Sequence, residues 1–174
     1  FGAGPATLPS SVIEQVKSNL QDFDNGMSIM EISHRSSAFK DYADQSEASI
    51  RKLLNISDDY AVLFLQGGAT FQFSMVPQNL SEWLPNKKYQ INGSANYLIT
   101  GGWSKKAADY AKFHTSVNTV YDSSENSYTS VIDIKDWNIN PDVDYFYYCA
   151  NETVHGLEIH ETPDISGPII CDMS

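Results

Sequence analysis

The sequence predicts an α/β fold with a mostly parallel sheet flanked by helices. Short apolar runs alternate with segments whose apolar residues lie at helical spacing, which is typical of strand–helix–strand units. The first and last runs are apolar without alternation, as expected for strands buried on both faces. The chain has 174 residues, 41% of them hydrophobic, so it can bury a core of its own.

Four segments are expected to be helical. The first begins near Ser11 and Glu14, whose spacing is typical of a capping box, and ends before Gly26. Pro77 predicts a kink or an early end in the third segment. The expected helices cover about residues 11–23, 37–54, 71–84 and 104–113.

Four apolar runs are expected to be strands, and a polar stretch at 123–128 is expected to be a surface loop. In an open α/β sheet the ligand lies beyond the carboxyl ends of the strands, so the residues after each run are the informative ones. The expected strands are 61–65, 97–99, 145–149 and 168–171. The segments that follow them contain Gln66-Gly67-Gly68-Ala69-Thr70, Thr100-Gly101-Gly102-Trp103, Asn151-Glu152-Thr153 and Asp172.

The segment from Gly67 to Thr70 is a candidate phosphate site. Glycines between a strand and a helix allow close approach of the backbone, and unpaired amides at the helix start attract an anion. An ordinary turn that needs glycine explains the segment equally well.

The other three strand ends carry side chains suited to a flat heteroaromatic ligand. Trp103 can stack on such a ring, although a core position is the simpler explanation for it alone. Thr153 can bond a ligand hydroxyl or cap a turn. Asp172 follows apolar residues and favours a positive partner, such as a pyridinium N–H, or else a helix cap or ion pair. Together these groups match the parts of pyridoxal 5'-phosphate.

A further cluster contains His34 and Arg35. The chain has only two arginines, Arg35 and Arg51, and a guanidinium in a loop can hold a carboxylate or phosphate. The alternative is a solvated pair beside the second helix.

The composition and charge of the chain make some classes of binding partner unfavourable. The net charge of −11 disfavours nucleic acid and anionic membranes. No apolar run is long enough to span a membrane, and residues 1–9 do not resemble a signal peptide. Cys149 and Cys171 are expected to be free buried thiols in a reducing compartment, with a disulfide between them as the alternative.

The sequence resembles the phosphoserine aminotransferase family of class-V, fold-type-I enzymes. The matching stretches keep the family's order across the whole chain, and those at 31–35 and 151–153 are the most specific. They are Phe1-Gly2-Ala3-Gly4-Pro5-Ala6, Met30-Glu31-Ile32-Ser33-His34-Arg35, Val62-Leu63-Phe64-Leu65-Gln66-Gly67-Gly68, Thr100-Gly101-Gly102-Trp103, Asn151-Glu152-Thr153 and Asp172-Met173-Ser174.

The resemblance implies a cytoplasmic homodimer that uses pyridoxal phosphate in serine biosynthesis. The implied reaction converts 3-phosphohydroxypyruvate and glutamate into phosphoserine and 2-oxoglutarate. Residues 1–36 would form an arm, a helix and the substrate-anion loop, and residues 37–174 the first part of the large cofactor-binding domain.

The resemblance also implies roles for individual residues. The amides at Gly68, Ala69 and Thr70 would bind the cofactor phosphate, and Trp103 would stack on the ring. Thr153 would contact the ring oxygen, Asp172 would pair with the ring nitrogen, and His34 with Arg35 would bind the substrate's distal anion. The implied roles of Asp172 and Trp103 are catalytic.

The chain departs from the family pattern in two ways. Some relatives carry arginine where this chain has Thr70. The family's Schiff-base lysine lies beyond Ser174, and all nine lysines of this chain precede Asp172. We therefore expect the chain to be inactive without a C-terminal part, whether it is a cleavage product, a truncated form or an independent module.

Two other functional classes remain open on the residues alone. One is a non-catalytic phosphate- or nucleotide-binding α/β module, which the glycine segment permits. The other is a purely structural interaction domain. Because the resemblance makes the chain part of a larger domain, the apolar residues at 145–148 and 169–170 are expected to need cover from a complementary chain or a tight oligomer.

Overall fold

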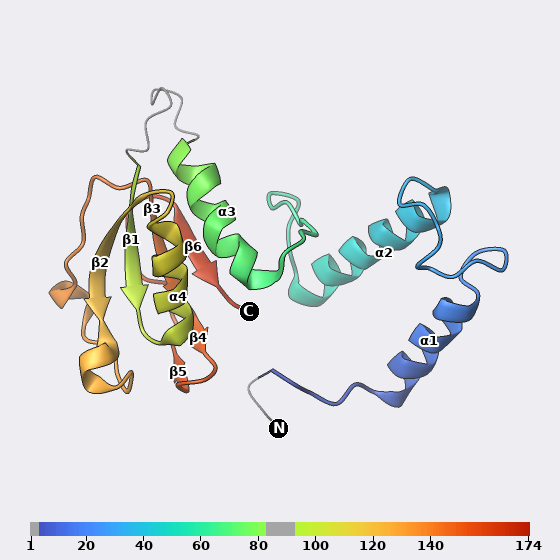
Figure 1. Ribbon diagram of the computed structural model, residues 1–174, viewed down its shortest axis with the longest axis horizontal. Helices are drawn as coiled ribbons and strands as arrows, with labels where there is room; N and C mark the ends of the chain where they lie inside the picture. Colours follow the sequence, from blue (N-terminus) through green and yellow to red (C-terminus); the bar gives the residue numbers. More distant parts are fainter. Residues whose placement is uncertain (1–3, 83–92) are drawn as a thin grey trace. The chain divides into compact units, whose positions relative to one another are not determined.

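The computed structural model describes residues 4–82 and 93–174, which form two compact units, Phe1–Phe64 and Leu65–Ser174 (Figure 1). The helices are α1 Ser10–Gln21, α2 Ser37–Leu54, α3 Gly68–Glu82 and α4 Gly102–Ala111. The strands are β1 Ser94–Ile99, β2 Ser116–Asp122, β3 Tyr145–Cys149, β4 Asn151–Glu152, β5 Leu157–Glu158 and β6 Ile169–Asp172. No helix in these described ranges is long and apolar enough to cross a membrane.

The first unit contains α1 and α2. The bounds of α2 agree with the prediction, because Ser36 accepts a hydrogen bond from the Phe39 amide and Asn55 ends the helix in a left-handed conformation. The predicted capping box at Ser11 is wrong. Helix α1 begins at Ser10, so Ser11 lies inside it, and the N-cap is Pro9, which has no side-chain oxygen to offer.

The second unit is built on a four-stranded parallel sheet in the order β2-β1-β3-β6. Strand β2 was not among the predicted strands. It contains several polar residues besides Val117 and Val120 and forms one edge of the sheet, so it lacks the continuous apolar run of a central strand. Its neighbour β1 is buried along almost its whole length.

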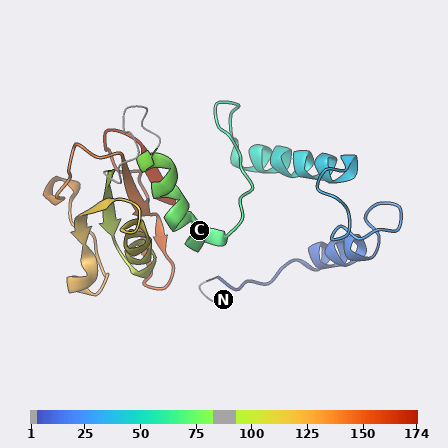
Figure 2. The same cartoon turned by 45° about the horizontal axis from the view of Figure 1, so that its top comes forward.

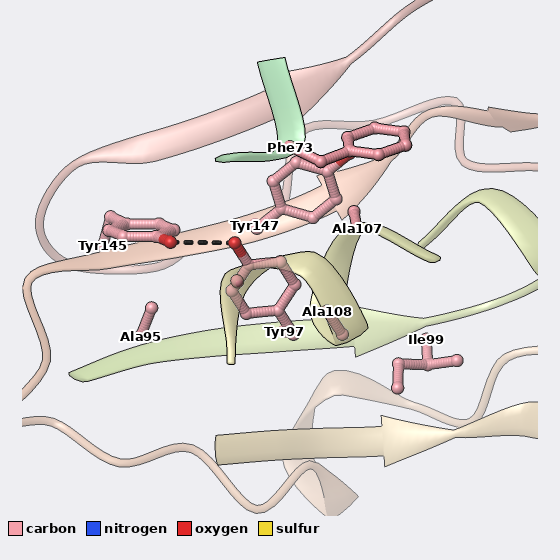
Figure 3. Packing of buried hydrophobic residues seen from close by; sticks show 9 residues of the cluster. Phe73, Ala95, Tyr97, Ile99, Ala107, Ala108, Tyr145 and Tyr147 are labelled. Atoms are coloured by element: carbon pink, nitrogen blue, oxygen red, sulfur yellow. Dashed lines mark hydrogen bonds between the residues drawn. The ribbon is translucent and has the colours of Figure 1, made fainter. Parts of the chain in front are cut away.

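Helices α3 and α4 cover one face of the sheet, as the two views show (Figures 1 and 2). Small residues on α4 allow it to approach β1 closely, and three tyrosines from β1 and β3 fill the space beneath the helices. Figure 3 shows these rings, with the Tyr97 and Tyr145 hydroxyls hydrogen-bonded at 2.8 Å. Tyr147 stacks on Tyr97 with a centroid distance of 4.8 Å.

The opposite face of the sheet is covered by segments without long helices. Phe146 stacks on Trp137 at a centroid distance of 5.9 Å, and Ile159 and Ile165 pack against the cluster that contains Phe146 and Tyr148. All five residues of β3 are therefore buried by the chain itself. The expectation that residues 145–148 need a partner chain to cover them is wrong, because α3 and α4 cover Tyr145 and Tyr147 while loop segments cover Phe146 and Tyr148.

The predicted strand at 61–65 is not a strand in the structure. Leu63, Phe64 and Leu65 are each more than half exposed, and no strand in the described ranges pairs with them. An apolar run becomes a strand only where a neighbouring strand accepts and donates its backbone hydrogen bonds. The local pattern was therefore insufficient here.

Three smaller expectations can be compared with the structure. Helix α3 continues through Pro77 without a break, since this proline is fully buried and packing holds the helix together. Residues Ser123–Asn126 form a 3-10 turn in which Ser123 is buried, while Ser124, Glu125 and Ser127 are exposed as expected for a surface segment. Cys149 and Cys171 are free thiols, the first buried and the second half-buried, as predicted.

Candidate functional site

The carboxyl ends of β1, β3 and β6 lie at one edge of the parallel sheet, and the predicted site residues follow these ends. Cys149 of β3 pairs with Asp172 of β6, the last residue of its strand. Helix α4 begins at Gly102 directly after β1, and Thr153 follows the short strand β4. Three of the four predicted segments thus meet at one edge, as the topology of the sheet requires.

The fourth segment reaches this edge as the start of α3. Helix α3 begins at Gly68, so its first amides, including those of Ala69 and Thr70, have no carbonyl partner within the helix. Gly67 has φ of +94°, and a Cβ on it would overlap the side chain of Phe71. The glycine is therefore required both by the backbone conformation and by the ring that packs against it.

Gly67→Ala should destabilise the second unit by about 1–3 kcal/mol from backbone strain alone, and more from the overlap with Phe71. Urea unfolding monitored by circular dichroism measures this. Gly167→Ala is the matched control, because Gly167 has φ of +97° but open space around its Cβ. Equal losses in the two variants would contradict a role for the contact with Phe71.

Trp103 and Thr153 are in direct contact. The Trp103 indole nitrogen donates to Thr153 Oγ1 at 3.1 Å, and the indole side chain remains partly exposed. The ammonium group of Lys106 lies 5.7 Å from the centroid of the Trp103 ring and 3.4 Å from Thr70 Oγ1. A cation therefore links the tryptophan to the start of α3.

Asp172 lines a cavity of about 380 Å³ together with Ala69 at the start of α3. Its carboxylate accepts hydrogen bonds from the Tyr147 hydroxyl at 3.0 Å and from the amide and hydroxyl of Ser174 at 3.0 and 2.7 Å. No cation pairs with Asp172 within the described ranges. The cavity thus holds a half-buried carboxylate with neutral donors only.

Tyr147 is the buried anchor of this carboxylate. Burial raises the pKa of Tyr147 strongly, and the nearby charge of Asp172 raises it further. The hydroxyl is therefore protonated at neutral pH and acts as a hydrogen-bond donor to Asp172.

Tyr147→Phe should lower the free energy of unfolding by about 1.5 kcal/mol near neutral pH, because a bond to a charged group is lost while the ring stays buried. Since the folded-state pKa of Tyr147 is raised, the unfolded chain ionises first, from about pH 10 upward. The stability that Tyr147 contributes to the wild type is then lost as pH rises, so the difference in unfolding free energy between the wild type and Tyr147→Phe should shrink. Unfolding free energies at pH 8 and 10.5 measure both effects. A difference that grows with pH would contradict this account.

Sequence reasoning missed three polar residues at this edge: Lys106, Tyr147 and Glu152. Lys106 follows Trp103 by three positions on α4, so helical spacing places both on one side. Tyr147 and Cys149 are two positions apart on β3, so both lie on the same face of the strand. These signals exist in the sequence, but they select these residues only once the site is known.

His34 and Arg35 lie in the first unit, and both are exposed. The Arg35 amide donates a hydrogen bond to Ser33 Oγ, and within the described part of the chain its guanidinium has no hydrogen-bond or ion-pair partner. Arg51, the other arginine, bonds to Glu47 and to the carbonyls of Ser57 and Tyr60. Of the two guanidiniums, the one at position 35 is thus available to a ligand.

Comparison with known proteins now identifies the family. The family model for "Aminotransferase class-V" matches residues 1–169 of the chain. The chain belongs to the class-V aminotransferase family. Within this class-V chain, the residues gathered at the sheet edge lie almost entirely inside the matched range, with Asp172 just beyond it.

Curated relatives agree with this assignment. The chain is 44% identical to the phosphoserine aminotransferase of Nitrosomonas europaea and 45% identical to that of Ruthia magnifica. Each alignment covers all of this chain but only 48% and 46% of the relative. This class-V chain thus spans about half the length of the curated relatives it matches.

Solved structures of phosphoserine aminotransferases have the same fold. The enzyme from Bacillus circulans subsp. alkalophilus matches with a TM-score of 0.86 and 35% identity over 100% of this chain and 46% of its own. The enzyme from Trichomonas vaginalis, described as bound to PLP, matches with a TM-score of 0.86 and 35% identity over 100% of this chain and 50% of its own. The parallel sheet with its flanking helices is therefore part of the phosphoserine aminotransferase fold.

Proposed function

We propose that this chain is the N-terminal part of a phosphoserine aminotransferase that binds pyridoxal phosphate at the sheet edge. The reaction is the exchange of an amino group between glutamate and 3-phosphohydroxypyruvate, giving 2-oxoglutarate and phosphoserine in serine biosynthesis. The chain's similarity to phosphoserine aminotransferases over its whole length supports this proposal.

The residues present suit the cofactor. Pyridoxal phosphate has a phosphate, a flat ring, a ring oxygen and a basic ring nitrogen. The sheet edge offers unpaired amides at Ala69 and Thr70, a partly exposed indole at Trp103, a hydroxyl at Thr153 and a carboxylate without a cation at Asp172. Asp172 and Ala69 share one cavity, which is the observation that carries the proposal.

When bound, pyridoxal phosphate supplies an electron sink for chemistry at the α-carbon of an amino acid. Asp172 would hold the proton on the ring nitrogen, and the neutral donors Tyr147 and Ser174 fix the orientation of its carboxylate. Trp103 would offer its partly exposed indole as a stacking surface for the ring and would help to exclude water from it. Thr153 Oγ1 accepts from the Trp103 indole, and its hydroxyl proton would be free to be donated to the ring oxygen.

The substrate's distal anion requires positive charge that the acidic chain largely lacks. In this proposal His34 and Arg35 bind that anion from residues 1–36, and residues 37–174 form the first part of the cofactor domain. Lys106 places an ammonium group beside Thr70, where some relatives carry arginine, and it would add positive charge for a phosphate held by the first amides of α3.

The proposal requires a C-terminal continuation with the Schiff-base lysine, on the same or a complementary chain. In this proposal the complete enzyme is a homodimer located in the cytoplasm. The exposed run at 61–65 supports such a partner, because Leu63, Phe64 and Leu65 expose apolar side chains and an unpaired backbone.

The test is a titration with pyridoxal phosphate, followed by a transamination assay with phosphoserine and 2-oxoglutarate. The 174-residue chain alone should not transaminate. The same residues joined to their continuation, here called the full-length enzyme, should bind the cofactor and form glutamate. Binding of phosphate or nucleotides without transamination by the full-length enzyme would instead indicate the phosphate-binding module.

A further inference from the structure

Helix α4 begins without a cap of its own. The residue before its first turn is Gly101, which has no side chain to accept hydrogen bonds from the amides that open the helix. Such amides are usually satisfied by a serine, threonine, aspartate or asparagine at the position before the helix. The cap of α4 must therefore come from elsewhere in the chain.

Glu152 supplies that cap from a different strand. Its Oε2 accepts from the Trp103 amide at 2.9 Å, and its Oε1 accepts from the Ser104 amide at 2.8 Å and from the Ser104 hydroxyl at 2.5 Å. Ser104 Oγ in turn accepts from the amides of Thr100 and Gly101. One carboxylate thus organises the entire connection between β1 and α4.

This carboxylate is fully buried, with 0% of Glu152 exposed. A buried charge is costly unless hydrogen bonds and favourable dipoles compensate for it, and here three donors and the positive end of α4 do so. A Cβ on Gly101 would lie 2.5 Å from Glu152 Oε2. Gly101 has an extended backbone, so glycine is required at this position by the volume of the glutamate.

The groups next to this carboxylate are those proposed to hold the cofactor ring. Trp103 is bound to Glu152 through its amide and to Thr153 through its indole nitrogen. Thr153 follows Glu152 directly in the chain. His155 adds a weaker tie, since its Nδ1 accepts from the Gly102 amide at 3.3 Å. A displacement of Glu152 would therefore displace Trp103 and Thr153 together.

We propose that Glu152 is a positioning residue that sets the Trp103 indole and the Thr153 hydroxyl for the cofactor ring. This inference rests on the proposed function for its ligand. Its geometric part, the control of Trp103 by Glu152, applies to the chain without any ligand. A helix cap with no effect on the site is the competing explanation, and the two differ in measurable ways.

The first experiment needs no cofactor. In the 174-residue chain, NMR resolves the indole N–H of Trp103 and its hydrogen exchange. Glu152→Ala should shift this resonance and speed its exchange roughly tenfold or more, because the bond to Thr153 loosens. Glu152→Gln keeps the volume and one acceptor oxygen, so its effect should be intermediate. An unchanged Trp103 indole in a folded Glu152→Ala or Glu152→Gln protein would overturn the inference.

Asn118→Ala is the control for general loss of stability. The Asn118 side chain donates to Asn96 Oδ1 at 2.7 Å and to the Asn138 carbonyl at 2.9 Å, within the sheet and away from Trp103. This variant should lower the melting temperature without changing the Trp103 indole. A similar indole change in Asn118→Ala would show that Glu152 acts only through stability.

The second experiment measures the dissociation constant for pyridoxal phosphate in the full-length enzyme. Glu152→Ala should weaken binding roughly tenfold to hundredfold, as is typical when a supporting group is lost. In a Trp103→Phe background the same change should cost much less, because its effect passes largely through Trp103. Independent, multiplicative losses would overturn the coupling. If the wild type fails to bind the cofactor, the proposed function fails, while the NMR result still decides the role of Glu152.

Discussion

Replacing Asp172 with alanine should nearly abolish transamination by the full-length enzyme, with a loss of at least about a hundredfold in turnover. The carboxylate is the only acidic side chain lining the described cavity, and it accepts bonds from Tyr147 and Ser174. Without it the ring nitrogen of the cofactor loses its proton, and a neutral pyridine is a poor electron sink. Cofactor affinity should also fall, by about 1.5–3 kcal/mol for one charge-assisted bond.

Steady-state kinetics and a cofactor titration measure these two losses separately. Asp172→Asn is the informative companion, since it keeps the volume and one acceptor for Tyr147 but removes the charge. Asp164→Asn is the control, because Asp164 is exposed and its change alters the net charge equally. Wild-type turnover in Asp172→Ala would remove this residue from the mechanism.

The second large effect is expected at Arg35. If its guanidinium holds the substrate's distal anion, Arg35→Ala should lower kcat/KM by roughly tenfold to hundredfold, which corresponds to about 1.5–3 kcal/mol. The loss should appear for both phosphoserine and glutamate, because each presents an anion there. Arg35→Lys should recover only part of the activity, since a point charge replaces a bidentate fork.

Cofactor affinity distinguishes this role from a contact with the cofactor phosphate, and it should barely change in Arg35→Ala. Lys40→Ala is the matched control, because Lys40 is an exposed cation in the same unit. Equal kinetic constants in Arg35→Ala and the parent would contradict the assignment. A loss confined to cofactor binding would move Arg35 to the cofactor phosphate.

Elements that depend on local chemistry were predicted well from the sequence. Helix α2 has its predicted bounds because Ser36 and Asn55 end it through contacts within a few residues. Strand β3 was also predicted with its observed bounds, because a central parallel strand is apolar on both faces. Trp103, Thr153 and Asp172 were placed at one edge because parallel strands end together.

Elements that depend on distant partners were not predicted. Strand β2 is a strand because β1 pairs with it, and the run at 61–65 is not one because no described strand does. The capping box at Ser11 failed for a different, local reason, since the helix had already begun at Ser10. A local sequence pattern shows which secondary structures a segment can adopt, whereas its backbone hydrogen bonds in a sheet depend on which strands lie beside it.

The amino-acid sequence by itself determined the fold class, most of the helices and the kinds of side chain that reach the sheet edge. These follow from the spacing of apolar residues and from the residues that end each element. Only the tertiary structure decided that Tyr147 anchors Asp172, that Lys106 lies between Thr70 and Trp103, and that Glu152 caps α4 in place of Gly101. The physical reason is that each arrangement depends on a hydrogen bond between residues 25 to 49 positions apart, which tertiary packing brings together.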